Sequence, residues 1–563
     1  MVDDLLVQLT NSGTYIQGYA DDIALMVTGK YCATVVDIMN NSLKHVSRWC
    51  AREGLKVNPT KTIILPFTRK RDLKALTRLE LDGVHLVPSE KAKYLGVTLD
   101  ARLTWNPYLD NILNKAKWAL MATKRCVGSS WGMKPNILQW LYVAVIRPQV
   151  TYAALVWWQK TNQSIASTKL ASLQRLVCLC ITGAFPSTPT VALEVLLNLL
   201  PLDLYIQMEA KKTAYKLSIT GSLRRDRSGT GHSSVIDTIM NNPILDMKSD
   251  IMDTQYMFTR PFSIAIDSRE DWETKRIKLP RAGIIWYTDG SVTKEGAGYG
   301  VHSTSPKTSL SGSLGGYCSI FQAEIIAILA SAELGLARGY RDKQINILSD
   351  SQASLKALDS SCISSKLVWE CLQALNALSS LNNVTLRWVP GHRGFEGNEQ
   401  ADKLAKKGAE TPFIGPEHAC GISLSLAKRT ILSCAKGEHF QRWRSFPGQA
   451  LGKILVGGPN QSLTRSLVRL SRSNIKLAIA FISGHGHFRN HLAKLGLHIG
   501  ETSCRLCIQA LLETAKHILL DCEALELRRR RIFEGRHPGE EKDACLVDKI
   551  VELVKFTKIG VTD

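Results

Sequence analysis

The chain has 563 residues, of which 45% are hydrophobic, and its 71 Lys and Arg against 50 Asp and Glu give a formal net charge of +21. A chain of this length is too long for one hydrophobic core, so we expect about three or four domains. The basic surplus favours a polyanionic partner, with nucleic acid first, although charge alone does not exclude an ordinary soluble basic protein.

Other bulk features exclude further classes of protein. No apolar run looks long enough to span a bilayer, so we expect no membrane partner. The start, MVDDLLVQL, has two acids and no basic stretch, which argues against a signal peptide. The 14 cysteines are scattered, so we expect no disulfide scaffold and an intracellular setting, nucleus and/or cytoplasm. No pattern indicates the oligomeric state.

Five segments follow one another along the chain. Residues 1–106 alternate between strands and helices, and residues 107–219 have mostly helical patterns. Residues 220–282 include the polar, Gly- and Ser-rich stretch GSLRRDRSGTGHSS, which is typical of a linker. Residues 283–410 alternate strand and helix again, as in an α/β domain, and residues 411–563 are helical and basic.

The first motif is TYIQGYADDIALMVTGK, residues 14–30. Two apolar runs flank Asp21 and Asp22, a pattern that predicts a hairpin with both carboxylates at its tip. Such a tip is either an ordinary turn or part of a metal-dependent site, and the motif alone leaves both readings open.

The α/β segment carries acidic residues at the ends of its elements. The strand of IIWYTDGS ends at Asp289, and the buried strand of INILSDSQAS ends at Asp350. Glu324 lies in the first turn of the helix FQAEIIAILASAELGLA. The last helix of the segment, for which Asn398 is a plausible N-cap, places Asp402 at its second turn.

Each of these residues alone has an ordinary explanation as a turn former, a helix cap or a group that favours the helix dipole. Together they predict more, because strand ends and helix starts can converge at one edge of a sheet. Four carboxylates held together repel one another unless cations lie between them. Oxygen ligands of this kind select Mg²⁺ or Mn²⁺, and two such ions can support phosphodiester cleavage.

The motifs YTDGS, QAEIIAI, SDSQAS and WVPGHRGFEGNEQADKLAKKGA closely resemble those of type 1 ribonuclease H, in order and spacing, over about 125 residues. The resemblance implies a mixed five-stranded sheet with flanking helices. It also implies cleavage of the RNA strand of an RNA–DNA hybrid with two Mg²⁺ or Mn²⁺ ions. The implied metal ligands are Asp289, Glu324, Asp350 and Asp402, and His392 would assist proton transfer or product departure. The basic loop of some family members is replaced by a plain amphipathic helix, SSKLVWECLQALNALSSLNNV.

The stretch CRLCIQALLETAKHILLDC has the spacing C-x2-C-x9-H-x4-C, formed by Cys504, Cys507, His517 and Cys522. Thiolates and an imidazole at this spacing favour a tetrahedral Zn²⁺ site over a helix with incidental cysteines. The stretch, residues 504–522, resembles the C-terminal zinc knuckle of retrotransposon polyproteins, which implies a structural role that aids binding of RNA or DNA. Residues 528–531, RRRR, fit phosphate contacts, a nuclear signal or a solvated helix face. SGHGHFRNHL, residues 483–492, recurs in such polyproteins without a role that we can derive.

YADD resembles the palm signature of reverse transcriptases, and GLKVNPTKT and KYLGVTLDARLTWN resemble later palm motifs of LINE-type (non-LTR) retrotransposons. The chain thus resembles the C-terminal part of such a Pol polyprotein. The expected fold is multidomain α/β: a partial palm (1–106), a helical thumb or connection (107–219), a linker (220–282), the ribonuclease H domain (283–410) and a helical tail with the zinc knuckle (411–563).

Only 18 residues precede Tyr19, so the earlier palm strand with its further Asp and the fingers are not expected in this chain. Asp21 and Asp22 are therefore read as a polymerase remnant that does not suffice for polymerisation. The leading functional hypothesis is a ribonuclease H in a truncated retrotransposon polyprotein. The alternatives are a nucleic-acid-binding remnant without turnover, and an RNA-directed DNA polymerase if the missing part is supplied.

Overall fold

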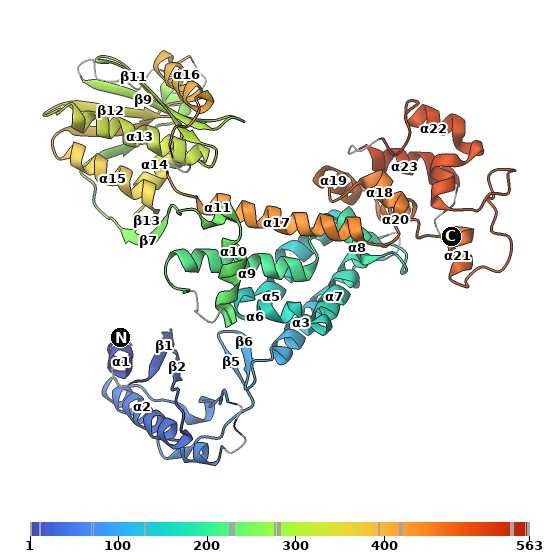
Figure 1. The fold of residues 1–563 in the computed structure, drawn as a ribbon, viewed down its shortest axis with the longest axis horizontal. Helices are drawn as coiled ribbons and strands as arrows, with labels where there is room; N and C mark the ends of the chain where they lie inside the picture. Colours follow the sequence, from blue (N-terminus) through green and yellow to red (C-terminus); the bar gives the residue numbers. More distant parts are fainter. Residues whose placement is uncertain are drawn as a thin grey trace. The chain divides into compact units, whose positions relative to one another are not determined.

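The computed structural model describes residues 3–10, 13–68, 70, 73–128, 131–224, 231–274, 277, 283–391, 394–415, 420–540, 545–557 and 559. The chain forms two compact units. Unit 1 comprises Met1–Ala153, Gln159–Leu197 and Gln449–Asp563, and unit 2 comprises Ala154–Trp158 and Asn198–Gly448. Each unit is therefore assembled from pieces that are distant in sequence, and Figure 1 shows the elements of each.

The first part of unit 1 is small and mixed α+β. Its elements are α1 (Asp3–Thr10), β1 (Tyr15–Tyr19), β2 (Asp22–Met26), α2 (Cys32–Arg52), η1 (Pro59–Lys61), η2 (Lys74–Arg78), β3 (Glu80–Leu81), β4 (Val84–His85), β5 (Lys91–Tyr94) and β6 (Val97–Asp100). Leu5 and Leu9 of α1 pack with Val46 and Trp49 of α2 in one apolar cluster, which Ile23 of the hairpin joins. The strands pair only within three hairpins, β1–β2, β3–β4 and β5–β6.

The rest of unit 1 is helical. The elements before residue 200 are α3 (Asn106–Lys124), α4 (Pro135–Leu141), η3 (Tyr142–Ile146), α5 (Arg147–Thr151), η4 (Trp158–Asn162, which begins at the last residue of a unit 2 segment), α7 (Ser164–Thr182) and α8 (Thr190–Leu196). Those after residue 448 are α18 (Ala450–Val456), α19 (Gln461–Arg469), α20 (Arg472–Ser483), α21 (Arg489–Lys494), η6 (His517–Asp521), η7 (Glu523–Leu525), α22 (Glu526–Ile532), α23 (Leu546–Val554) and η8 (Lys555–Thr557). The expected tail is thus divided, because residues from Gln449 onward group with the helices of 106–196 while the helix before them belongs to unit 2.

The buried guanidinium of Arg472 accounts for part of this grouping. It donates to the backbone carbonyls of Gly128 (3.0 Å) and Cys180 (3.1 Å), two segments that precede it by about 300 residues in the sequence. A buried Arg is stable only when such acceptors replace its water. Arg472 therefore fastens the start of α20 to the loop after α3 and to the end of α7.

Unit 2 contains the α/β domain and the elements that surround it. They are α6 (Ala154–Trp157), α9 (Leu202–Ile219), η5 (Gly231–Ser233), α10 (Ser234–Met240), α11 (Pro243–Asp246), β7 (Ile251–Tyr256), β8 (Ser263–Ala265), α12 (Arg269–Glu273), β9 (Ile284–Val292), β10 (Ala297–Thr304), β11 (Lys307–Gly315), α13 (Ile320–Ala337), β12 (Gln344–Ser349), α14 (Gln352–Asp359), β13 (Cys362–Ser365), α15 (Lys366–Ser379), β14 (Asn383–Trp388), α16 (Glu396–Glu410) and α17 (Leu424–Ser445).

The central sheet of unit 2 has the order β11-β10-β9-β12-β14-β8. β11, β10 and β9 are antiparallel, whereas β9, β12, β14 and β8 run parallel. The predicted mixed sheet is therefore present, with one strand more than the five expected. The sixth strand, β8, comes from residues 220–282, which we expected to be a linker. The described part of that segment also provides α10, α11, β7 and α12. The linker prediction rested on the Gly- and Ser-rich start of the segment, whereas β7 and β8 form by pairing with β13 and β14.

Glycines set how closely α16 approaches the sheet. A Cβ atom on Gly298 would lie 2.1 Å from the backbone nitrogen of Ala409, and one on Gly300 would lie 2.3 Å from the carbonyl oxygen of Ala401. Only glycine permits such contact between a strand and a helix backbone. Gly298 and Gly300 therefore allow α16 to pack directly against β10.

Two helices, α7 and α13, are long and apolar enough to cross a membrane by length and composition, contrary to our expectation that no run is. About half of each segment is buried inside the fold, 50% for Ser164–Thr182 and 56% for Ile320–Ala337. Helix α13 packs against β9 and α15, and its apolar residues belong to the core of unit 2. Their hydropathy therefore fits helices whose apolar sides pack within the protein.

Candidate active site and metal centre

Three of the four predicted carboxylates meet at one edge of the central sheet. Asp289 lies in β9, Glu324 in α13, and Asp350 directly after β12. Each offers a carboxylate oxygen, and these atoms all lie within 4.8 Å of one another. β9 does not end at Asp289 as predicted but continues to Val292, because its antiparallel pairing with β10 extends to that residue.

Backbone register explains why these residues meet. β9 and β12 are parallel, and Thr288 pairs with Ser349, so the next residues, Asp289 and Asp350, lie side by side. The Thr288 hydroxyl donates to the carbonyl of Leu348 and fixes this register. A Cβ atom on Gly290 would lie only 2.5 Å from the backbone nitrogen of Glu324. Glycine at this position therefore allows the start of α13 to reach the strand that carries Asp289.

Burial makes these carboxylic acids weaker acids than they are in water. Asp289 and Glu324 are each only 6% exposed. Burial, together with the charges of Asp350 and Asp402, raises the pKa of Asp289 to about 8. Burial and the neighbouring carboxylates also raise the pKa of Glu324 well above its ordinary value, although the Gly290 amide and the Ser349 hydroxyl donate to it. The three carboxylates therefore cost free energy unless positive charge is placed among them.

The cluster fits a hard divalent cation. Glu324 Oε2 is buried and has no hydrogen-bond partner within the described residues. An unpaired carboxylate oxygen beside two further carboxylates is the oxygen-rich arrangement that Mg²⁺ or Mn²⁺ prefers.

Asp402 lies on α16 beside this cluster rather than in it. Its charge raises the pKa of Asp289, which places it nearby, but it does not belong to the group within 4.8 Å. Its carboxylate forms an ion pair with Lys406 Nζ, one helical turn on, at 2.7 Å. Lys406 thus supplies positive charge at the position where the resemblance implies a metal ion.

The loop before α16 contributes residues of a different kind. Gly391 approaches Asp350 so closely that a Cβ atom on it would lie 2.6 Å from Asp350 Oδ2. Asn398 is not the N-cap, which is Phe395, because α16 begins at Glu396. Asn398 instead lies buried in the first turn, and its Nδ2 is 3.4 Å from Asp350 Oδ2. His392, the predicted proton-transfer residue, lies outside the described residues.

Two contacts were not predicted from the sequence: the ion pair of Lys406 with Asp402 and the contact of Asn398 with Asp350. Lys406 stands four residues after Asp402, the spacing at which helical ion pairs form, so this partner could have been found. The contact between Asn398 and Asp350 could not, because it depends on how α16 approaches the end of β12.

The four predicted zinc ligands also converge. Atoms of Cys504, Cys507, His517 and Cys522 all lie within 4.8 Å of one another, with Cys507 Sγ 3.3 Å from His517 Nε2. Cys504 N–H donates to the carbonyl of Leu511, which closes the loop that holds the first two cysteines. Burial and the charge of Cys504 raise the pKa of Cys522 to about 12. A bound cation reverses this effect by stabilising thiolates, so the donor set fits Zn²⁺.

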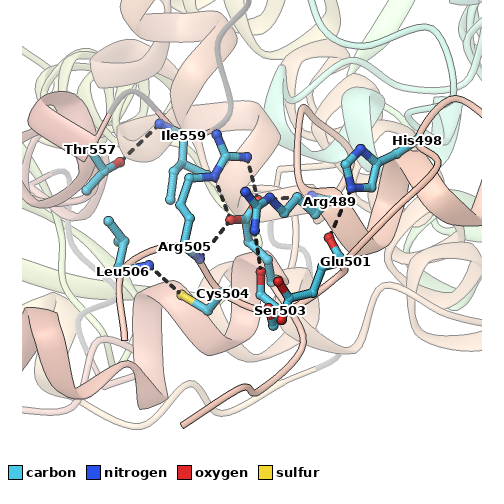
Figure 2. Close-up of polar contacts among 10 residues, drawn as sticks. Arg489, His498, Glu501, Ser503, Cys504, Arg505, Leu506, Thr557 and Ile559 are labelled. Carbon is cyan, nitrogen blue, oxygen red and sulfur yellow. Dashed lines mark hydrogen bonds and ion pairs between the residues drawn. The ribbon is translucent and has the colours of Figure 1, made fainter. Parts of the chain in front are cut away.

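An ion pair between the buried Glu513 and the partly exposed Arg505 supports this cluster, and no local sequence pattern predicts it. Glu513 is fully buried and accepts from Arg505 Nε at 2.7 Å and Arg505 Nη2 at 2.8 Å, as well as from the Arg489 amide. Figure 2 shows Arg489 and Arg505 beside Cys504, with the Arg489 guanidinium reaching Ser503. Burial would raise the pKa of Glu513, but these hydrogen bonds outweigh it and hold the pKa below its ordinary value. The charged carboxylate thus ties the cysteine loop to the start of α21.

The histidines of SGHGHFRNHL form a hydrogen-bonded chain with a residue near the end of α7. Ser187 Oγ lies 3.0 Å from both His485 Nδ1 and His491 Nε2. His491 Nδ1 lies 2.8 Å from the carbonyl of Gly486, which can only accept, so His491 donates a hydrogen bond at Nδ1. This motif therefore joins two segments of unit 1.

At the N-terminus, Asp21 and Asp22 lie at the tip of the β1–β2 hairpin, as the sequence predicted. Both are exposed, as are the rings of Tyr15 (61%) and Tyr19 (65%) on the hairpin. Among the described residues, neither aspartate belongs to a group of three possible metal ligands.

The mixed sheet and its carboxylate cluster define a ribonuclease H-like domain. Residues 281–410 match the RNase H family model, and residues 1–99 match the model of reverse transcriptase (RNA-dependent DNA polymerase). The chain is related to Pol polyproteins of non-LTR retrotransposons.

Two relatives illustrate this relationship. The putative 115 kDa protein of the type-1 retrotransposable element R1DM of Drosophila melanogaster is 28% identical over 38% of this chain and 21% of its own length. The probable RNA-directed DNA polymerase from transposon BS, also of Drosophila melanogaster, is 34% identical over 25% of this chain and 15% of its own. The chain therefore spans only a small part of these relatives. The crystal structure of RNase H1 from Halobacterium salinarum aligns with 22% of this chain and 96% of that one, with 23% identity and a TM-score of 0.18.

Proposed function

We propose that residues 283–410 form a metal-dependent endoribonuclease that cleaves the RNA strand of RNA–DNA hybrids, within a retrotransposon polyprotein. The observation that carries this proposal is the cluster of Asp289, Glu324 and Asp350, whose oxygens lie within 4.8 Å of one another in a largely buried setting. Carboxylates that repel one another are retained where cations hold them together for catalysis.

The residues of the site would have three roles: holding metal ions, orienting the carboxylates and assisting proton transfer. Asp289, Glu324, Asp350 and Asp402 would hold two divalent ions, which supply an activated water and stabilise the leaving oxygen. The Gly290 amide and the Ser349 hydroxyl orient Glu324, and Asn398 orients Asp350. Lys406 forms an ion pair with Asp402 and supplies positive charge beside the carboxylates. His392 would assist proton transfer or product departure.

A cleavage assay with the full chain tests this proposal. Wild-type protein should cut a labelled RNA–DNA hybrid in the presence of Mg²⁺, and Asp289→Asn should reduce the rate by at least about 10³-fold. Asp342→Asn is the matched control, since Asp342 is an exposed residue of the same domain with positive φ, which Asn tolerates. Equal rates for wild type and Asp289→Asn would contradict the assignment.

We further propose that Cys504, Cys507, His517 and Cys522 bind one structural Zn²⁺ and that this knuckle helps the basic chain to hold RNA or DNA. The supporting observation is the convergence of all four ligand atoms. A salt-dependent gel shift that weakens when the zinc is removed would support this role. Unchanged binding after removal of the zinc would contradict it.

For the hairpin, we propose that Asp21 and Asp22 do not by themselves support polymerisation. Two-metal polymerisation requires a further carboxylate, and neither aspartate has two more ligands near it in the described part of the chain. A primer-extension assay tests this proposal. Templated incorporation of deoxynucleotides by the chain alone would contradict it.

A further inference from the structure

Two cysteines of unit 2 are in direct contact outside both metal clusters. Cys318 lies between β11 and α13, and Cys420 lies between α16 and α17, 102 residues further along. Their sulfur atoms are 3.3 Å apart. All fourteen cysteines of the chain are free thiols in the structure, so this pair is reduced.

Hydrogen bonds of the neighbouring residues hold both cysteines in place. Cys318 directly precedes Ser319, the N-cap of α13, whose capping box with Gln322 fixes this end of the helix. The Gln322 side-chain amide donates to the carbonyl of Gly421 at 3.0 Å, so the helix start is bonded to the residue after Cys420.

The segment around Cys420 is anchored on its other side as well. Ile422 N–H donates to the carbonyl of Lys248 at 2.8 Å, and Asp250 N–H donates to the carbonyl of Ile422 at 3.0 Å. Gly421 has φ +75°, and a Cβ atom on it would lie 2.9 Å from Asp250 N, so only glycine fits this close approach. The short sulfur distance is therefore a product of several independent contacts.

The two thiols differ in reactivity. Cys318 is 6% exposed, whereas Cys420 is half-buried and can be reached more easily. The hydrogen bond between the thiols lowers the pKa of Cys420 and raises that of Cys318, to which burial adds. Since the thiolate is the nucleophile, Cys420 is the group that an oxidant meets first.

We propose that Cys318 and Cys420 are a redox modification site, at which a reversible disulfide joins residues 420–422 to the start of α13. With oxidised glutathione, the Cys420 thiolate attacks one sulfur and releases one glutathione thiolate. The Cys318 thiol then gives up its proton, attacks the mixed disulfide at Cys420 and releases the second glutathione. The two cysteine thiols lose two electrons and two protons in total, and one oxidised glutathione becomes two reduced ones.

The bond requires little movement, because the sulfur atoms close from 3.3 Å to about 2.05 Å. It would close a loop that contains Glu324, Asp350 and Asp402. A cross-link over so long a loop restricts the unfolded chain and so stabilises the domain that carries the carboxylates. This inference does not depend on the proposed ribonuclease activity.

Disulfide mapping on the full chain tests the proposal. The reduced protein is incubated with oxidised glutathione, free thiols are alkylated, and the digest is analysed by mass spectrometry. We expect the Cys318 and Cys420 peptides to be recovered as one linked pair, two hydrogens lighter than their sum, with loss of alkylation at both residues. Dithiothreitol should restore both thiols.

Two variants sharpen the result. Cys420→Ser should abolish the linked pair, whereas Cys362→Ser, which removes an exposed thiol of the same unit, should leave it unchanged. Amide exchange at residues 421–423 should slow on oxidation of wild type and of Cys362→Ser. The proposal is overturned if wild-type Cys318 and Cys420 are both recovered alkylated while Cys362 carries glutathione, because the oxidant then reached the protein and the pair did not respond.

Discussion

The carboxylates of the sheet domain and those of the N-terminal hairpin differ more than the sequence suggests. Asp21 and Asp22 are adjacent in the chain, yet both are exposed at the tip of a two-stranded hairpin. Asp289 and Glu324 are 35 residues apart in sequence, yet both are 6% exposed and nearly in contact. Proximity in sequence is therefore a poor guide to a metal site, and convergence of separate elements is a better one.

The surroundings of the two acidic groups explain this difference. Around Asp289, a parallel neighbour strand places Asp350 and a close helix places Glu324. Around Asp21, the described strands form only the β1–β2 hairpin, and α1 and α2 pack on it through apolar residues. The sheet domain thus confines negative charge, whereas the hairpin leaves it in solvent.

The largest expected effect comes from removing one confined charge. Glu324→Gln should reduce hybrid cleavage by at least about 10³-fold. It should also raise the free energy of unfolding of the domain by roughly 1–3 kcal/mol in chelator, because it relieves burial and repulsion of a carboxylate. Cleavage assays and denaturant unfolding measure the two effects. Glu333→Gln, an exposed residue of the same helix, should change neither. A Glu324→Gln variant that cleaves normally would contradict the comparison.

The second largest effect is expected at the cysteine–histidine cluster, where thiolates are brought together as the carboxylates are in the sheet domain. Cys507→Ser should abolish bound zinc and reduce the stability of the knuckle by several kcal/mol, on the order expected when a structural zinc site loses a ligand. Metal analysis and limited proteolysis measure these effects. Cys545→Ser, which changes an exposed cysteine outside the cluster, should retain full zinc content. Retention of zinc by Cys507→Ser would show that Cys507 is not a zinc ligand, although it lies close to the other three residues.

The pH dependence of stability sharpens the comparison further. The pKa of Asp289 is raised from 3.8 to about 8 in the folded protein. Between these values the folded protein binds more protons than the unfolded chain, so stability falls as the pH rises. In chelator we expect a loss on the order of 2–4 kcal/mol between pH 4 and pH 8 in excess of that shown by Asp289→Asn. Unfolding curves across this range measure the loss. If the free energy of unfolding changes equally with pH in wild type and Asp289→Asn, the pKa of Asp289 is not raised by burial.

The smallest effect is expected at the hairpin. Asp22→Asn should leave hybrid cleavage unchanged and alter the free energy of unfolding by less than about 0.5 kcal/mol. The reason is that an exposed carboxylate is solvated in both the folded and the unfolded chain. The same two assays used for Glu324→Gln measure this. A large loss of cleavage would mean that the hairpin and the sheet domain act together.

Much of the site could be predicted because its residues stand in local patterns. Asp289 and Asp350 follow apolar strands, Glu324 begins an apolar helix, and the four zinc ligands lie within 19 residues. Each of these patterns involves residues that are close together in the sequence, so it can be recognised without knowledge of the fold. The resemblance to ribonuclease H then implied a mixed sheet with flanking helices.

The parts that were missed depend on long-range packing or on weak patterns. β8 has only three residues and forms a strand because its backbone pairs in parallel with β14 at the edge of the sheet. The buried Glu513 accepts hydrogen bonds from the Arg505 guanidinium and the Arg489 backbone amide, which belong to separate segments. No local pattern contains such information.

The most direct test of the central claim is strand-specific cleavage by the wild-type chain. A hybrid labelled on both strands is compared with double-stranded RNA, double-stranded DNA and single-stranded RNA, each with Mg²⁺ and with chelator. We predict that only the RNA strand of the hybrid is cut, and only with Mg²⁺. Binding of the hybrid without cleavage, or cleavage that persists in chelator, would contradict a metal-dependent ribonuclease at Asp289, Glu324 and Asp350.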